Sequence, residues 1–160
     1  MNTPTLANPR LNVGAAIVAG LIAGAVFMML EMMMVPMFLG GSPWGPPRMI
    51  AAIAMGTDVL PPPATFDLGI LMVAIMVHLA LAIVLALVFA LIAKGRPMGM
   101  AIMIGAVFGL VVYLVSFYGM TAVFPWFAEA RNWVSAFAHV MFGVVLGWAY
   151  AWRTTTRLHR

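Results

Sequence analysis

Three ionisable side chains lie inside strongly apolar stretches of this 160-residue chain. Glu31 stands among six methionines in "FMMLEMMMVPMF" (27–38), His78 opens "HLALAIVLA" (78–86), and His139 opens "HVMFGVVLG" (139–147). A carboxylate and two imidazoles can exchange protons near neutral pH. They can equally bind a metal ion, and two imidazoles can ligate a haem iron. Each of these chemistries requires the fold to bring the three residues together.

Composition indicates what kind of element carries these residues. Hydrophobic residues make up 65% of the chain and charged residues 8%, whereas soluble domains have roughly half and a quarter. Four stretches reach the roughly 20 apolar residues that cross a hydrocarbon core; they are 12–39, 67–93, 99–124 and 132–152. Between their end residues, Glu31 is the only formally charged residue. The predicted fold class is an all-α integral membrane protein, a four-transmembrane-helix bundle that forms a single domain over residues 1–160.

Basic residues are distributed unequally between the two sides of these stretches. The side with the termini and the loop after the second stretch carries Arg10, Lys94, Arg96, Arg153, Arg157 and Arg160, and the other side carries Arg48 and Arg131. By the positive-inside rule, both termini are cytoplasmic in a multi-pass, bacterial-type inner membrane. The net charge of +4 then indicates the lipid bilayer, with its anionic headgroups, as a partner. Nucleic acid is not an expected partner, because no soluble basic surface is present.

The absence of cysteine excludes several kinds of chemistry. There can be no disulfide, no thiolate metal site, no cysteine-ligated iron–sulfur cluster and no cysteine nucleophile. No spacing of serine, histidine and carboxylate indicates a catalytic nucleophile either. The segments outside the apolar stretches are too short for a soluble catalytic domain. We therefore expect a protein that is not an enzyme.

The loop 40–66 is rich in glycine and proline at both ends and apolar in its centre. Its central segment, "RMIAAIAMG" (48–56), predicts a short helix at the membrane interface that ends at Gly56. We interpret this loop as a packed cover with no ligand of its own.

The sequence also suggests that a two-helix unit is repeated. "GLIAG" (20–24) and "GAVFG" (105–109) are each followed by an apolar run and a Pro-Trp pair, and His78 and His139 each have small residues four and eight positions on. Because an even number of crossings restores the orientation, this pattern predicts two parallel helix-hairpin repeats.

Depth along the helices places the ionisable residues in one layer. At a rise of about 1.5 Å per residue, Glu31 and Ser116 lie about 12 Å from the helix ends on the side of the 40–66 loop, His78 about 16 Å and His139 about 10 Å. Each shares a helix face with small residues, which mark packing faces in membranes. We predict a polar layer of Glu31, His78 and His139. Its supporting residues would be Tyr113, Ser116, Tyr118, Met28 and Met32.

Several of these segments together resemble a known family. "GLIAGAVFMMLEMMMVPMFLGGSPW" (20–44), "HLALAIVLALVFALIAKG" (78–95) and "GAVFGLVVYLVSFYGMTAVFPWFAEARNWVSAFAHVMFGVV" (105–145) are similar to YagU-like small inner-membrane proteins. The likeness is strongest at His78 and in the spacing of Glu129, Trp133 and His139. The resemblance implies a small polytopic inner-membrane protein, without an established reaction.

Three functions fit these observations. The first is proton or metal handling by the polar layer, with copper as a candidate ion because imidazole and thioether suit Cu(I). The second is a noncatalytic accessory subunit of a larger, respiratory-type membrane complex, whose other subunits would meet the methionine-rich surface. The third is haem or quinone binding, with His78 and His139 as an axial pair on helices that run in the same direction.

The predicted topology can be tested with reporter fusions. Reporters of cytoplasmic and periplasmic location, fused at Lys94 and at the C-terminus, should both report cytoplasm. The reason is that six basic residues lie on the predicted cytoplasmic side and two lie on the other side. A periplasmic signal from either fusion would contradict the predicted orientation.

Overall fold

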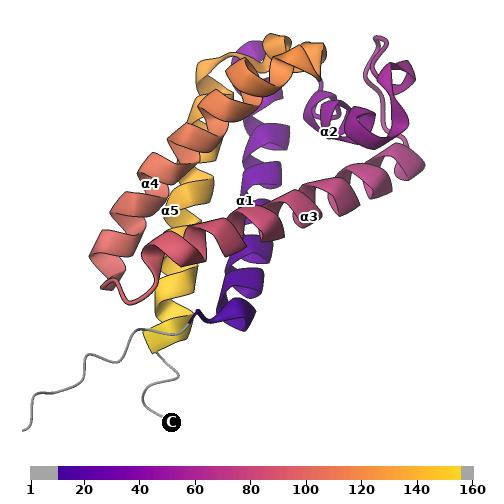
Figure 1. The fold of residues 1–160 in the computed structure, drawn as a ribbon. Coiled ribbons are helices and arrows are strands. Elements are labelled where there is room, and N and C mark those ends of the chain that lie inside the picture. Colours follow the sequence, from indigo (N-terminus) through magenta and orange to yellow (C-terminus); the bar gives the residue numbers. More distant parts are fainter. Residues whose placement is uncertain (1–10, 156–160) are drawn as a thin grey trace, which may run out of the picture.

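The computed structural model describes residues 11–155, whose regular structure is entirely helical (Figure 1). Four helices are long and apolar enough to cross a membrane: α1 (Val13–Leu39), α3 (Leu68–Ala93), α4 (Met98–Leu114) with its continuation to Ala122, and α5 (Trp133–Thr155). Their ends differ from the predicted stretches by at most three residues, so the prediction of an all-α fold with four helices that could span a membrane is confirmed. Arg10, Arg157 and Arg160, which supported the predicted orientation, lie outside the described residues.

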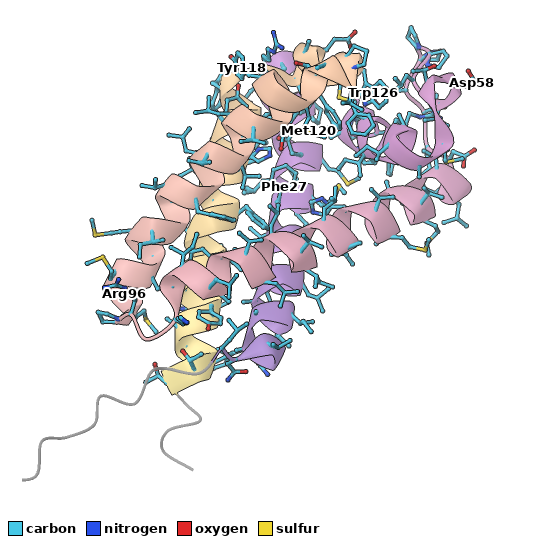
Figure 2. All side chains as sticks on the ribbon, viewed as in Figure 1. Phe27, Asp58, Arg96, Tyr118, Met120 and Trp126 are labelled. Atoms are coloured by element: carbon cyan, nitrogen blue, oxygen red, sulfur yellow. The ribbon has the colours of Figure 1, made fainter. Side chains whose placement is uncertain are left out.

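The molecule has two distinct ends, which we name the α2 side and the terminal side (Figure 1). The α2 side carries the short helix α2 and the segment that follows α4. The terminal side carries the connection between α3 and α4 and both ends of the described chain. Asp58 and Trp126 lie on the α2 side and Arg96 lies on the terminal side (Figure 2).

Local capping explains where α1, α3 and α5 begin and where α1 ends. The side-chain oxygens of Asn12, Asp67 and Asn132 each accept the backbone N–H three residues on, at 2.9–3.0 Å. These bonds satisfy N–H groups that a helix start leaves without a partner, a need that is greatest near lipid. Helix α1 ends at Gly40, whose φ of 67° is left-handed and suits glycine.

Helix α5 lies at the centre of the assembly. Helices α1 and α4 pack along it, and α3 packs against α1. Helix α3 has little contact with α4 or α5; it crosses α1 obliquely, and its N-terminal half runs away from α4 toward α2 (Figure 1). The bundle is therefore open between α3 and α4 on the α2 side.

The closest helix contact joins α4 and α5 through glycines. Gly105 and Gly109 of α4 face Gly143 and Gly147 of α5, and a Cβ atom added at Gly143 would collide with the backbone of Gly105. Small residues allow the backbones of membrane helices to approach closely, where dispersion contacts stabilise them. The predicted packing face of α5 is confirmed.

A second small-residue contact joins α1 and α3. A Cβ atom added at Gly20 would lie 2.8 Å from the carbonyl oxygen of Ala82, and one added at Gly24 would lie 2.9 Å from the Cβ atom of Ala82. The same α1 face continues to Glu31, as the sequence predicted. Met29, Met33 and Met37 point away from this face and are mostly exposed, which suits contact with lipid.

The 40–66 loop folds over the α2 end of α3. Its helix α2 (Gly45–Met55) ends at Gly56 as predicted, and two prolines occupy its first turn. Buried alanines of α2 pack against α3. The indole N–H of Trp126 donates to the carbonyl of Met49 at 3.0 Å. This bond ties α2 to the turn η4 (Pro125–Ala130) that precedes α5.

Replacing either contact glycine by leucine should destabilise the protein. We expect Gly143→Leu and Gly24→Leu each to cost about 1–3 kcal/mol or more, because the added side chain forces two backbones apart. Thermal unfolding in a mild detergent measures the change. The matched control is Gly99→Leu, since nothing lies within 4 Å of a Cβ atom there. Equal unfolding temperatures for Gly143→Leu and Gly99→Leu would contradict the assigned contact.

Candidate functional site

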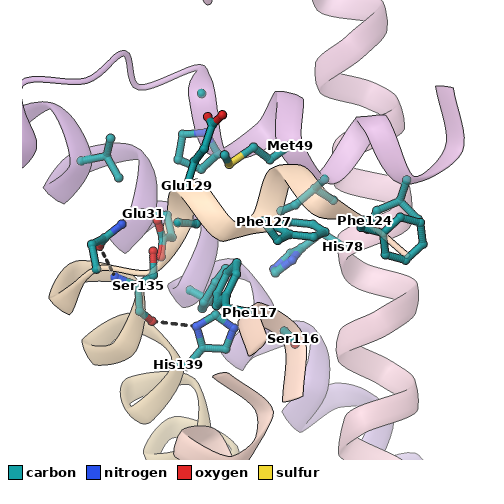
Figure 3. Close-up of a pocket in the computed structure, with 18 of the residues that line it drawn as sticks. Glu31, Met49, His78, Ser116, Phe117, Phe124, Phe127, Glu129, Ser135 and His139 are labelled. Carbon is teal, nitrogen blue, oxygen red and sulfur yellow. Dashed lines mark hydrogen bonds between the residues drawn. The ribbon is translucent and has the colours of Figure 1, made fainter. Parts of the chain in front are cut away.

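A cavity of about 530 Å³ lies on the α2 side, where α3 diverges from α4 (Figure 3). Its wall is built from α1, α2, α3, α5 and the segment from the end of α4 to α5. Exposed residues line it from α3 and from the end of the third span, Leu81 at 46% and Met120 at 40% exposure. The cavity therefore reaches the surface between α3 and the end of the third span, which have few contacts with each other. Its volume falls in the range of roughly 300–1,000 Å³ that is common for small-molecule sites.

Glu31 is the buried acid of this cavity. Its side chain is 4% exposed, and its Oε1 atom has no hydrogen-bond partner among the described residues. Ser135 of α5 lies beside the carboxyl group (Figure 3). A buried charge without a cationic partner costs several kcal/mol. The fold holds Glu31 here because the small-residue face of α1 points inward.

His78 lines the cavity from α3. Its Nε2 atom lies 2.8 Å from the carbonyl oxygen of Gly24 on α1. Because a carbonyl oxygen can only accept, Nε2 carries the hydrogen, and Nδ1 is left as an acceptor when the ring is neutral. The close approach of α1 and α3 at Gly24 and Ala82 brings this imidazole to the α1 backbone.

His139 is held by its own helix. It is 7% exposed, and its Nδ1–H donates to the carbonyl of Ser135 at 2.7 Å. Its Nε2 atom has no hydrogen bond to the described residues. Aromatic rings of Phe27, Tyr113 and Phe117 surround the imidazole at centroid distances of 4.6–5.6 Å. In both histidines, one ring nitrogen thus donates its hydrogen to a backbone carbonyl, and the other can accept a proton or a hydrogen bond.

The three predicted residues line one cavity but do not form one metal centre. Within residues 11–155, no group of three His, Asp or Glu side chains lies close enough to hold a metal ion. Phe27 packs against both imidazoles, 5.3 Å from His78 and 4.6 Å from His139. The expected shared metal site is therefore corrected to three separate polar groups in a common wall. A haem between the two imidazoles would require the Phe27 ring to move.

The predicted supporting residues have different positions. Ser116 lines the cavity, whereas Tyr113 lies behind its wall and donates its hydroxyl hydrogen to the carbonyl of Asn132 at 3.4 Å. Tyr118 is exposed and lies beneath the guanidinium of Arg131, 4.6 Å from the ring centroid. Met28 and Met32 are not among the residues that line the cavity. Tyr118 also does not line the cavity, so the support expected from Tyr118, Met28 and Met32 stays a prediction.

The structure adds a π-helical turn that the sequence did not predict. The π-helical turn comprises Val115–Gly119, directly after α4. Its backbone places Ser116 and Phe117 in the cavity wall. Arg131 supports this turn, because its Nε–H donates to the Phe117 carbonyl at 2.6 Å. Such turns often occur at functional sites. The hydrophobic pattern of an α-helix does not show where a π-helical turn adds a residue, so the sequence alone does not predict this turn.

Two further residues of the site were missed. Phe27 precedes Glu31 by four residues, so their shared helix face could have identified it. Glu129 of η4 is exposed and lines the cavity as a second acid. There was less reason in the sequence to select Glu129 as a site residue, because it lies outside the apolar stretches.

No protein-family model, curated protein sequence or solved structure matches the chain. The chemistry of the cavity is therefore inferred from its own residues.

Because no cation among the described residues pairs with the buried Glu31, neutralising its carboxyl group should increase the stability of the protein. Glu31→Gln should stabilise the protein by about 1–3 kcal/mol at pH 8, because a neutral amide loses less on burial than an unpaired charge. Thermal unfolding in detergent measures the change. Glu129→Gln is the matched control and should leave stability within about 0.5 kcal/mol, because Glu129 is exposed. Destabilisation by Glu31→Gln would show that a cation pairs with the carboxylate.

Proposed function

We propose that this protein is a noncatalytic inner-membrane protein that moves protons across the membrane by way of Glu31, His78 and His139, which line the cavity. The Glu31 carboxyl group carries the proposal, because it is buried within a spanning helix and its Oε1 atom lacks a hydrogen-bond partner among the described residues. Ionisable groups inside a span are costly and commonly belong to ion or proton pathways. A carboxyl group that only stabilised packing would be expected to have its hydrogen bonds satisfied.

The two histidines support proton exchange at the same wall. Each is fixed through one ring nitrogen, by Gly24 for His78 and by Ser135 for His139. The other nitrogen of each ring can bind and release a proton without breaking these bonds. Imidazole does so near neutral pH in most surroundings. The wall thus holds three groups that can change protonation state at similar depth.

The orientation that we propose places the α2 side toward the periplasm. Lys94, Arg96 and Arg153 lie on the terminal side of the described chain, and Arg48 and Arg131 lie on the α2 side. Arg48 donates to the carbonyls of Val59 and Thr65, so its role in folding the loop explains a basic residue there. Protons would then reach Glu31 from the periplasmic half of the membrane.

We also keep the two-hairpin repeat and the YagU-like family as proposals. The hairpins α1–α3 and α4–α5 each pack through small residues, and a histidine lies on the second helix of each. The contacts between the two hairpins are unequal, because α1 packs along α5 whereas α3 has few contacts with α4. Duplication followed by divergence of α3 accounts for both observations.

The accessory-subunit alternative has one supporting observation. Met29, Met33 and Met37 form an exposed stripe on α1, and flexible methionines suit adaptable protein contacts. A stable partner that co-purifies from native membranes and covers this stripe would favour the alternative.

Proton exchange can be measured in liposomes. Protein reconstituted around a trapped pH-sensitive dye should move protons when a potassium diffusion potential is imposed. Glu31→Gln should reduce the rate at least about tenfold, because the buried carboxyl group is removed from the path. His78→Ala, His139→Ala and the triple variant complete the series. If the three act as one unit, the losses should be strongly non-additive.

The control for this series is Ser116→Ala, which lines the same cavity and makes no hydrogen bond to the described residues. It should retain the wild-type rate within about twofold, since a hydroxyl group does not change protonation state in this range. Rates equal to those of empty liposomes for the wild type, or purely additive losses, would overturn the proposal.

A further inference from the structure

The charges around the cavity have one sign. Glu31 and Glu129 line it, and none of its described lining residues is a lysine or an arginine. The two arginines of the α2 side are engaged elsewhere, Arg48 with backbone carbonyls of the loop and Arg131 with Phe117 and Thr121. A cavity with two acids and no lysine or arginine among its described lining residues favours a positively charged occupant, because such an occupant supplies the missing counter-charge.

The apolar part of the wall is unusually aromatic. Five phenylalanines line the cavity: Phe27, Phe117, Phe124, Phe127 and Phe142. The face of a phenyl ring carries partial negative charge and attracts organic cations, most strongly where water is excluded. The rings also bury apolar groups of a ligand. A ligand that satisfies both features carries a positive charge and a large apolar surface.

We propose that this cavity binds a lipophilic organic cation, whose charge pairs with Glu31 and whose apolar groups pack against the phenyl rings. This assignment rests on the proposed function, since the proton and the cation would share the Glu31 carboxylate. Two further acceptors, the second ring nitrogens of His78 and His139, suit a ligand that donates hydrogen bonds. An anionic ligand would meet two carboxylates and, among the described lining residues, no lysine or arginine.

The position of the cavity gives such a ligand a route from the bilayer. Leu81 and Met120 line it and are exposed at 46% and 40%. They belong to the second span and to the end of the third span, whose helices diverge at this level. Lipophilic cations partition into membranes and would enter between these helices. The acid wall then lies at the inner end of the entrance, within the α2 half of the membrane.

Sharing one carboxylate makes cation binding dependent on pH. At low pH a proton occupies Glu31 and the cation is released; at high pH the carboxylate is free to bind it. The other titratable groups near Glu31 are His139 from α5, His78 from α3, Tyr113 from α4 and Glu129 from η4. Protonation of either histidine adds positive charge to the wall and also opposes the cation, so both effects act in the same direction.

The test uses the purified full-length protein in a mild detergent and two ions of equal size and opposite charge. Equilibrium dialysis of tetraphenylphosphonium should show one saturable site, with binding that weakens at least tenfold between about pH 8 and pH 5. Tetraphenylborate should show no saturable binding. Equal binding of the two ions would overturn the proposal, because the cavity would then recognise apolar surface alone. No saturable binding of tetraphenylphosphonium at pH 8 would overturn it as well.

Variants locate the charge that matters. Glu31→Gln should weaken tetraphenylphosphonium binding at least about tenfold and remove most of its pH dependence. Glu129→Gln, which neutralises the exposed acid, should weaken it no more than about threefold. An unchanged affinity in folded Glu31→Gln, as judged by its thermal unfolding, would exclude Glu31 as the binding group and overturn the proposal.

The two proposals fail in different ways. A wild-type protein that moves protons through Glu31 but does not bind tetraphenylphosphonium would retain the proposed function and overturn the ligand class. A protein that binds the cation through Glu31 but moves no protons in liposomes would support the cation site and overturn the proton pathway.

Discussion

The backbones of α4 and α5 meet at glycines, and the other features of the structure depend on this contact. Gly109 of α4 lies directly against the backbone carbonyl of His139, and Gly105 lies against Gly143. No side chain larger than hydrogen fits at these points. The contact fixes the axial position and the rotation of α5, and therefore the direction in which His139 and Ser135 point. Because α1 packs along the same helix, the depth of Glu31 relative to these residues is also set by α5.

Helix α3 is held differently, and the cavity results from that difference. It packs on α1 through Ala82 and Ala86, near the middle of its length, and diverges from α4 toward the α2 side. In lipid there is little hydrophobic force to close such a gap, because acyl chains contact apolar side chains as well as another helix does. Helix α2 and the turn η4 cover part of the opening and are joined through Trp126. The remaining space is where buried polar groups become accessible.

Burying the polar groups of the cavity wall lowers the free energy of unfolding, and packing alone does not explain why they are buried. Among the described residues no cation pairs with the buried Glu31, and three aromatic rings enclose the His139 imidazole. A core of the same volume made of leucine and phenylalanine would be expected to be more stable. Retention of these groups around a space of small-molecule size is consistent with binding and proton exchange. The aromatic rings and the two acids without a lysine or arginine suit the ligand that we propose, a cation with a large apolar surface.

Much of the fold could be predicted from the sequence, and the reason is local. The four spans, the helix ends at Asp67 and Gly56, and the small-residue faces at Gly24 and Gly143 follow from transfer energies and helical period, which neighbouring residues determine. The common depth of Glu31, His78 and His139 followed from the same arithmetic.

Only the tertiary structure decided what these residues face. The separation of the histidines from a shared metal site, the place of Phe27, the π-helical turn and the divergence of α3 all depend on contacts between distant segments. The period of a helix says which residues share a face. The crossing angle of two helices decides which of those faces meet, and it depends on side chains from both.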